Sequence, residues 1–295
     1  MRVTQQMMAD RTSQSIGDNL ERLNALQSKA ASGKRFEKTS DEPLSARAAL
    51  GLRSHLQTTQ AYLNASERTA DWMSATESAL GQMVDLATQA VTLTLKGVSD
   101  TGADGRPLLA QEVNQLLEQA IQVGNTTHAG SAIFAGYQVQ STQPFNLILG
   151  SPDTVSYNGD TGVIQRNLGP GQNVTVNVDG EAAFTPLFNA LIEARDALNA
   201  GDVNSIQLSA THLQSAQEQV AEVRSVNGTR QRQVSAIADQ LQEAHSTLAS
   251  LLSQREDVNL AEAITDLRRQ ETVYQSALEV GNRTLATLNL FDLMR

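Results

Sequence analysis

The sequence predicts a mainly α protein: a long, coiled-coil-like helical bundle formed by both ends of the chain, with a small central β-rich insert. Apolar residues near both ends recur at alternating three- and four-residue steps, the spacing of a coiled-coil seam. The apolar composition suits narrow helix–helix seams, because 37 Ala and 35 Leu stand against six Phe, four Tyr and one Trp. Alternating β-branched residues gather only in the middle of the chain.

The N-terminal third is expected to hold three helices. Ile16, Leu20 and Leu23 form a short apolar stripe, and the segment 32–35 (Ser-Gly-Lys-Arg) breaks it. A long second helix over 42–96 should follow, because Pro43 suits a first helical turn and an apolar stripe continues beyond it. A third, shorter helix is expected over 109–123, after a turn rich in Gly and Asp.

The centre of the chain changes character. Residues 145–150, 154–159 and 173–180 have the composition of strands, and the last of them ends on Asp-Gly, a typical turn dipeptide. Pro186 is expected to restart helix, which should end near Gly201.

The C-terminal part predicts a helical rod and a terminal helix. The stretch 204–253 contains one Gly and no Pro, so it could form a helix of roughly 75 Å. Beyond it the terminal apolar stripe continues. We expect it, with the stripe near the N-terminus, to make the assembly contacts through Ile16, Leu20, Leu23, Ile264, Leu267, Tyr274, Leu278, Leu285 and Leu288.

These elements predict a nested organisation with three parts. Residues 1–45 and 255–295 should form a terminal helical domain, and residues 46–130 and 185–254 a helical rod. Residues 131–184 should form the β-rich insert.

Composition argues against most kinds of active or binding site. The absence of Cys excludes a disulfide scaffold, a Cys-ligated metal and a thiol nucleophile. A net charge of -10 argues against nucleic acid as a partner, and no apolar run is long enough to span a membrane. No apolar segment follows Met1, so no secretory signal peptide is expected.

Catalytic and metal-binding motifs are also missing. The four His stand alone, and the segment 100–105 resembles half of a calcium loop but has Gln111 where a bidentate Glu is needed. We therefore expect no enzyme, with no catalytic residues, no cofactor and no metal. The alternative of a surface lectin or glycosidase would place its site in the insert, where Asp153, Asp160 and Asp179 are the available acids.

Both ends of the chain resemble the bacterial flagellin family. The likeness rests on Ala31-Ser32-Gly33-Lys34-Arg35 with Ser40-Asp41-Glu42-Pro43, and on the C-terminal runs 258–265 and 270–275. Met-Arg-Val at the start, Phe134-Ala-Gly-Tyr137 and Tyr157-Asn-Gly-Asp160 resemble the branch of that family found at the hook–filament junction.

The resemblance implies a structural subunit of an extracellular helical tube. The terminal helices would form its inner part and the insert its outer part. The subunit would join hook to filament, so that filament assembly and swimming require it; the alternative is a short flagellin that builds the filament itself. The implied partners are the first hook-associated protein, flagellin, copies of itself in a helical ring and a cytoplasmic flagellar export chaperone. Export would proceed through the flagellar type III apparatus, without a cleaved signal peptide.

Overall fold

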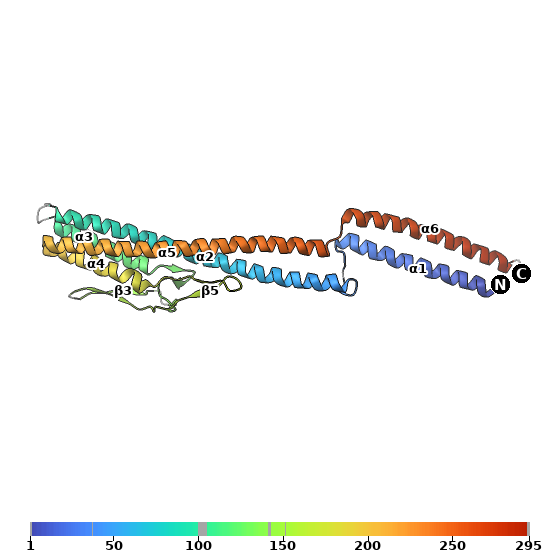
Figure 1. Ribbon diagram of the computed structural model, residues 1–295, viewed down its shortest axis with the longest axis horizontal. Helices are drawn as coiled ribbons and strands as arrows, with labels where there is room; N and C mark the ends of the chain where they lie inside the picture. Colours follow the sequence, from blue (N-terminus) through green and yellow to red (C-terminus); the bar gives the residue numbers. More distant parts are fainter. Residues whose placement is uncertain (1, 37, 100–104, 141–142, 151, 294–295) are drawn as a thin grey trace. The chain divides into compact units, whose positions relative to one another are not determined.

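A computed structural model describes residues 2–36, 38–99, 105–140, 143–150 and 152–293, without the side chains of 2–6, 9 and 284–293. The segment 100–104 of the calcium-like loop and the side chains of Leu285 and Leu288 therefore lie outside the described residues. The helices are α1 (Arg2–Ser32), α2 (Pro43–Val98), α3 (Arg106–Gly124), α4 (Gly180–Ala200), α5 (Val203–Glu256) and α6 (Leu260–Leu293). The mainly α fold with paired chain ends is confirmed (Figure 1).

The strands of the insert form three separate antiparallel ribbons. They are β1 (Thr127–His128) with β2 (Ser131–Ala132), β3 (Phe145–Ile148) with β4 (Thr154–Tyr157), and β5 (Gln165–Asn167) with β6 (Asn173–Thr175). In the β3–β4 hairpin Phe145 faces Tyr157, and Ile148 faces Thr154. The small central β-rich insert is thereby confirmed, with β5 as a strand that the sequence pattern did not predict.

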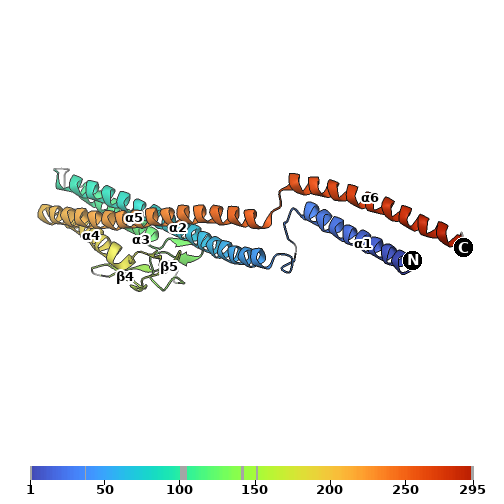
Figure 2. The same ribbon diagram turned by 45° about the vertical axis from the view of Figure 1, so that its right-hand side comes forward.

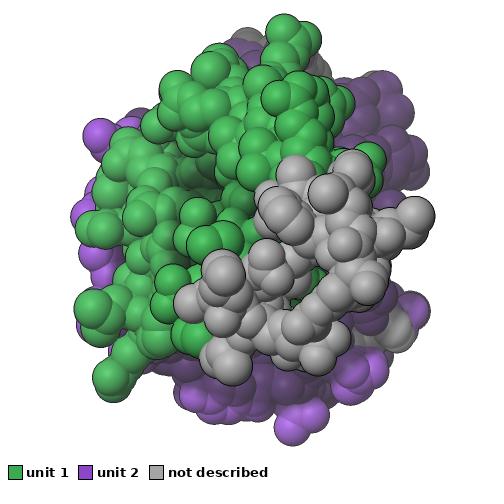
Figure 3. All heavy atoms as spheres, turned by 90° about the vertical axis from the view of Figure 1, so that its right-hand side faces the viewer, with its two compact units in different colours: residues 1–58, 244–295 green, residues 59–243 purple. Residues whose placement is uncertain are grey.

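The chain divides into two compact units, coloured separately in Figure 3. Unit 1 comprises residues 1–58 and 244–295, and unit 2 comprises residues 59–243. Both divisions of the chain fall within long helices, the first within α2 and the second within α5.

Unit 2 holds the main hydrophobic core, where α2, α3, α4 and α5 bury one apolar cluster. Few aromatic residues are available, and they gather here: the rings of Phe145 and Phe188 lie 5.2 Å apart between centroids, and those of Phe134 and Phe184 lie 4.6 Å apart. Phe134 and Phe145 belong to the insert, so the insert contributes directly to this core.

Helix α4 begins earlier than the position of Pro186 suggested. Asp179 caps it, because Oδ1 accepts the backbone N–H groups of Glu181 and Ala182 at 3.1 and 3.3 Å, so Asp-Gly starts a helix rather than closing a hairpin. Pro186 then lies inside the helix and cannot donate to the carbonyl of Ala182. Gln219 of α5 donates its Nε2 to that carbonyl at 2.9 Å and replaces the missing bond.

Two short motifs of the insert pack against each other. Asp160 Oδ1 accepts the backbone N–H of Tyr137 at 2.7 Å and that of Gly162 at 2.8 Å. Gly136 has φ +63°, and a Cβ there would collide with the carbonyl oxygen of Asp160. The two motifs therefore form one folded element that requires glycine at position 136.

Gly136→Ala should destabilise unit 2 more than Gly171→Ala. Both positions have positive φ and share a backbone cost of about 1–2 kcal/mol, but Gly171 has open space around it. The collision at Gly136 should add about 1–3 kcal/mol. Denaturant unfolding followed by near-ultraviolet circular dichroism measures the difference, and equal losses for the two variants would contradict this packing.

The β3–β4 hairpin is tied to the helices by one ion pair. Arg195 Nη1 lies 2.8 Å from Asp153 Oδ2 and 3.1 Å from Asn114 Oδ1, with only 11% of the Arg195 side chain exposed. The backbone N–H of Gly150 donates to Asp153 Oδ1 at 2.8 Å. That bond and the Arg195 guanidinium lower the pKa of Asp153.

Acid should loosen this hairpin before the helices. Because the folded pKa of Asp153 lies below its unfolded value of about 3.9, its contribution is present above about pH 4 and is lost as the pH falls through the folded pKa. Amide exchange across β3 and β4 should therefore accelerate between pH 6 and pH 3, beyond the intrinsic pH dependence of exchange. In Asp153→Asn the protection should be weak at both values, and an unchanged pH response in that variant would contradict the assignment.

Candidate assembly surface of the terminal helices

Helices α1 and α6 of unit 1 form an antiparallel pair (Figure 1, Figure 2). Each turns a stripe with three- and four-residue spacing towards the other, as in a coiled coil. The residues of the two stripes are Thr12, Ile16, Asn19, Leu23, Leu26 and Ala30, and Ala263, Leu267, Gln270, Tyr274, Ala277 and Gly281.

Small and polar residues set the spacing of this pair. A Cβ at Gly281 would lie 2.8 Å from Ile16 Cδ1, so glycine permits the close approach of the two helices. Gln270 Nε2 donates to Asn19 Oδ1 at 3.1 Å across the seam. The seam therefore combines a few apolar contacts with one amide bond, and it is less apolar than an ordinary protein core.

The residues expected to make assembly contacts divide into two groups. Leu23 is buried, and Ile16, Leu267 and Tyr274 are half-buried in the seam. The other described members are exposed: Leu20 by 40%, Ile264 by 45% and Leu278 by 43%. The sequence stripe thus supplies both the contact between the two helices and side chains that the pair leaves uncovered.

The exposed group lies on one side of the helix pair. On each helix these residues follow the seam positions by the same rotation, and equivalent flanks of two antiparallel facing helices meet on one side. Leu260, exposed by 51%, occupies the same flank of α6. We call Leu20, Leu260, Ile264 and Leu278 the outer stripe.

The helix pair ends at a joint where two chain segments cross. The backbone N–H of Arg35 donates to the carbonyl of Glu256 at 2.6 Å, and the N–H of Val258 donates to the carbonyl of Gly33 at 2.9 Å. Gly33 turns the chain with φ +68°, beyond the end of α1. These bonds hold the connection from α1 to α2 against the connection from α5 to α6.

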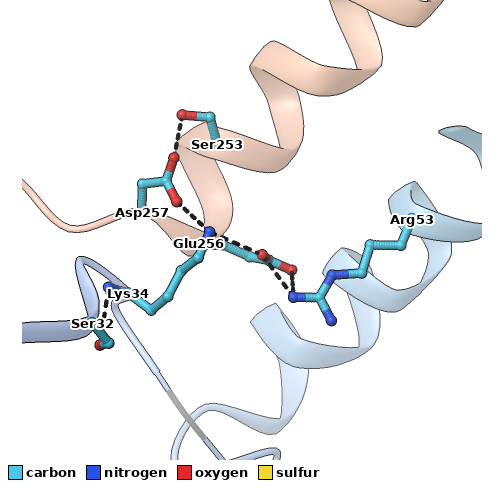
Figure 4. A network of polar contacts seen from close by, with 6 residues as sticks. All are labelled: Ser32, Lys34, Arg53, Ser253, Glu256 and Asp257. Carbon is cyan, nitrogen blue, oxygen red and sulfur yellow. Dashed lines mark hydrogen bonds and ion pairs between the residues drawn. The ribbon is translucent and has the colours of Figure 1, made fainter. Parts of the chain in front are cut away.

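Side chains reinforce the joint (Figure 4). Lys34 Nζ lies 2.6 Å from Asp257 Oδ1 and 3.5 Å from Glu256 Oε2. Arg53 of α2 places Nη2 2.8 Å from the same Glu256 carboxylate, whose side chain is only 5% exposed. We call Lys34, Arg53, Glu256 and Asp257 the joint cluster.

The charges of the joint cluster are mutually stabilising. Its hydrogen bond to Asp257 raises the pKa of Lys34, and the same bond, with a second from Ser253, lowers the pKa of Asp257. Both groups therefore stay charged across the neutral range.

Sequence reasoning missed the joint cluster. Glu256 and Asp257 read as part of a solvated helix face, because a pair of acids on an apolar-striped helix usually is one. The available signal was the Asp-Val-Asn run after the long helix, which marks its end opposite the break at 32–35.

The three acids of the insert are all engaged in holding local structure. Asp153 pairs with Arg195, Asp160 binds backbone N–H groups, and Asp179 caps α4. Among the described residues, no group of three or more His, Asp or Glu could hold a metal ion. None of the described helices is long and apolar enough to cross a membrane.

Paired chain ends with an apolar stripe left uncovered define a helical protein of the self-assembling, structural class. Residues 3–139 match the family described as the bacterial flagellin N-terminal helical region. The resemblance to the bacterial flagellin family is thereby confirmed.

Named relatives agree with this family. The chain is 23% identical over 198 residues to flagellar hook-associated protein 3 of Salmonella typhimurium, covering 66% of this chain and 61% of that protein. It is 25% identical over 206 residues to the protein of that name from Escherichia coli, covering 69% and 63%. The match thus spans less than two thirds of the length of each relative.

The fold is shared with a solved structure described as the flagellar junction protein FlgL from Legionella pneumophila. The TM-score is 0.59 at 14% identity, covering 72% of this chain and 100% of that chain.

Proposed function

We propose that this chain is the structural adaptor that joins the flagellar hook to the flagellin filament. The observation that carries the proposal is the similarity, over about two thirds of this chain, to relatives named flagellar hook-associated protein 3. The antiparallel pairing of both chain ends supports it, because a subunit of a helical tube needs an elongated surface that neighbouring copies can share.

In this proposal the terminal helices form the inner part of the tube. Ile16, Leu23, Leu267 and Tyr274 hold α1 against α6, while the outer stripe contacts neighbouring subunits. Leu285 and Leu288 continue the same sequence periodicity. The three-part division at residues 45, 130, 184 and 254 then separates inner tube, rod and outer insert, and no step of the function requires catalysis.

The proposed location is the hook–filament junction, outside the cell. The neighbours would be the first hook-associated protein on one side and flagellin on the other, with copies of this chain forming the ring between them. Before export through the flagellar type III apparatus, a cytoplasmic chaperone would hold the terminal region.

Deletion of the gene tests the proposal. We expect cells that do not swim and that release flagellin into the medium, with both defects reversed by the wild-type chain on a plasmid. Swimming cells with normal filaments after deletion would contradict the proposal.

Copy number separates this proposal from a short flagellin that builds the filament. A junction ring needs only a few turns of the helix, whereas a filament needs copies along its whole length. Quantitative mass spectrometry of sheared flagella should find this chain as a minor component beside flagellin. A chain that forms the bulk of the sheared protein would establish the alternative.

A further inference from the structure

The β3–β4 hairpin presents an apolar knob to solvent. Ile148 is 53% exposed and Leu149 is 78% exposed at the end of β3. We call these two residues the knob. Behind them Asp153 and the largely buried Arg195 tie the hairpin to α4, so the knob is held in place. An apolar group that is fixed before binding loses little conformational entropy when a partner covers it.

The opposite chemistry occurs elsewhere on unit 2. A hollow of about 400 Å³ lies between the loop 161–163, the segment 175–179 and the face of α5 from 219 to 230. Val178, Val223 and Val226 line it, and Val226 is 46% exposed. At its edge Arg230 Nη1 donates to the carbonyl of Asn177 at 3.2 Å, which leaves that guanidinium partly neutralised. The hollow therefore offers an apolar surface to a short apolar side chain.

Knob and hollow cannot meet within one copy. The knob is fixed near Arg195, whereas the hollow borders Ala182 and Ala183 at the start of the same helix. These positions are about 18 Å apart along α4 at 1.5 Å per residue. Each surface remains free for a contact with another molecule.

We propose that the knob of one copy sits in the hollow of the next copy, a contact that rests on the self-assembly in the proposed function. A second copy is the occupant because one chain supplies both halves of an uncharged, apolar match. Since the two surfaces differ, the contact is heterologous, and its repetition generates a helical arrangement rather than a closed dimer. Unit 2 would thus carry a lateral contact in addition to that of the terminal helices.

Disulfide trapping tests the contact, because the chain has no Cys of its own. The variant with Leu149→Cys and Val226→Cys replaces the gene in flagellated cells, and the flagella are oxidised. We expect a ladder of trimers and larger species in denaturing gels without reductant. The matched control joins Leu149→Cys to Leu208→Cys, a residue exposed by 58% on the same helix but outside the hollow, and should give no such ladder.

The outcomes separate this inference from the proposed function. If the wild-type chain restores filaments but the Leu149–Val226 pair yields no ladder, the inference is wrong and the adaptor role stands. A mixed disulfide with flagellin or another flagellar protein, in place of the ladder, would also overturn the choice of a second copy. If the wild-type chain fails to restore filaments, the proposed function itself fails.

Discussion

Aspartate at both Ile264 and Leu278 should leave the isolated chain folded and abolish junction assembly. Both side chains are nearly half exposed, so their replacement should change the free energy of unfolding by no more than about 0.5 kcal/mol. In the assembled junction the same positions would bury charge against apolar neighbours, which is strongly unfavourable. Thermal unfolding followed by circular dichroism checks the first part, and swimming of complemented deletion cells checks the second.

Val273→Asp is the matched control for this variant. Val273 is 43% exposed on α6, about two and a half turns from Ile264, so it lies on the opposite flank of the helix pair. Cells carrying this control should swim. If it stops assembly as completely as the double variant, the outer stripe is not the contact surface.

Arg53→Ala should have the largest effect on the joint. The substitution leaves the buried carboxylate of Glu256 with only Lys34 at 3.5 Å, and an unsatisfied buried group of this kind costs about 1–3 kcal/mol. Amide exchange at Arg35 and Val258, whose N–H groups bridge the two chain segments, should accelerate by roughly 5- to 150-fold.

Two further variants make the joint prediction specific. Arg53→Ala with Glu256→Leu removes both charges, so part of the lost protection should return. Arg269→Ala breaks an exposed pair with Asp266 and should change exchange at the joint very little. Equal acceleration in Arg53→Ala and Arg269→Ala would show that Glu256 is not held by Arg53.

Periodicity predicted the helices well, because seam residues repeat in sequence. The break at 32–35 and the start of α2 at Pro43 follow from local residue chemistry, and the structure has both. The regular rhythm also placed Leu267 and Tyr274 in the seam. It could not distinguish them from Ile264 and Leu278, because neighbouring positions on one helix flank carry similar apolar residues.

Contacts between distant segments account for what the sequence did not predict. Asp179 caps a helix because Gly180 packs closely on Phe134, and the helix can contain Pro186 because Gln219 bonds the freed carbonyl. The joint cluster likewise depends on Arg53 and Glu256 meeting across about 200 residues of chain. A local pattern holds no information about such pairs.

The position of this chain on the flagellum tests the adaptor role most directly. Tyr137→Cys places one thiol on the insert, at a residue exposed by 65%, in a chain without other Cys. Gold labels attached there can be located in electron micrographs of intact flagella from complemented cells. A single band of gold where the hook meets the filament is the result that the account predicts. Gold distributed along the length of the filament would contradict it.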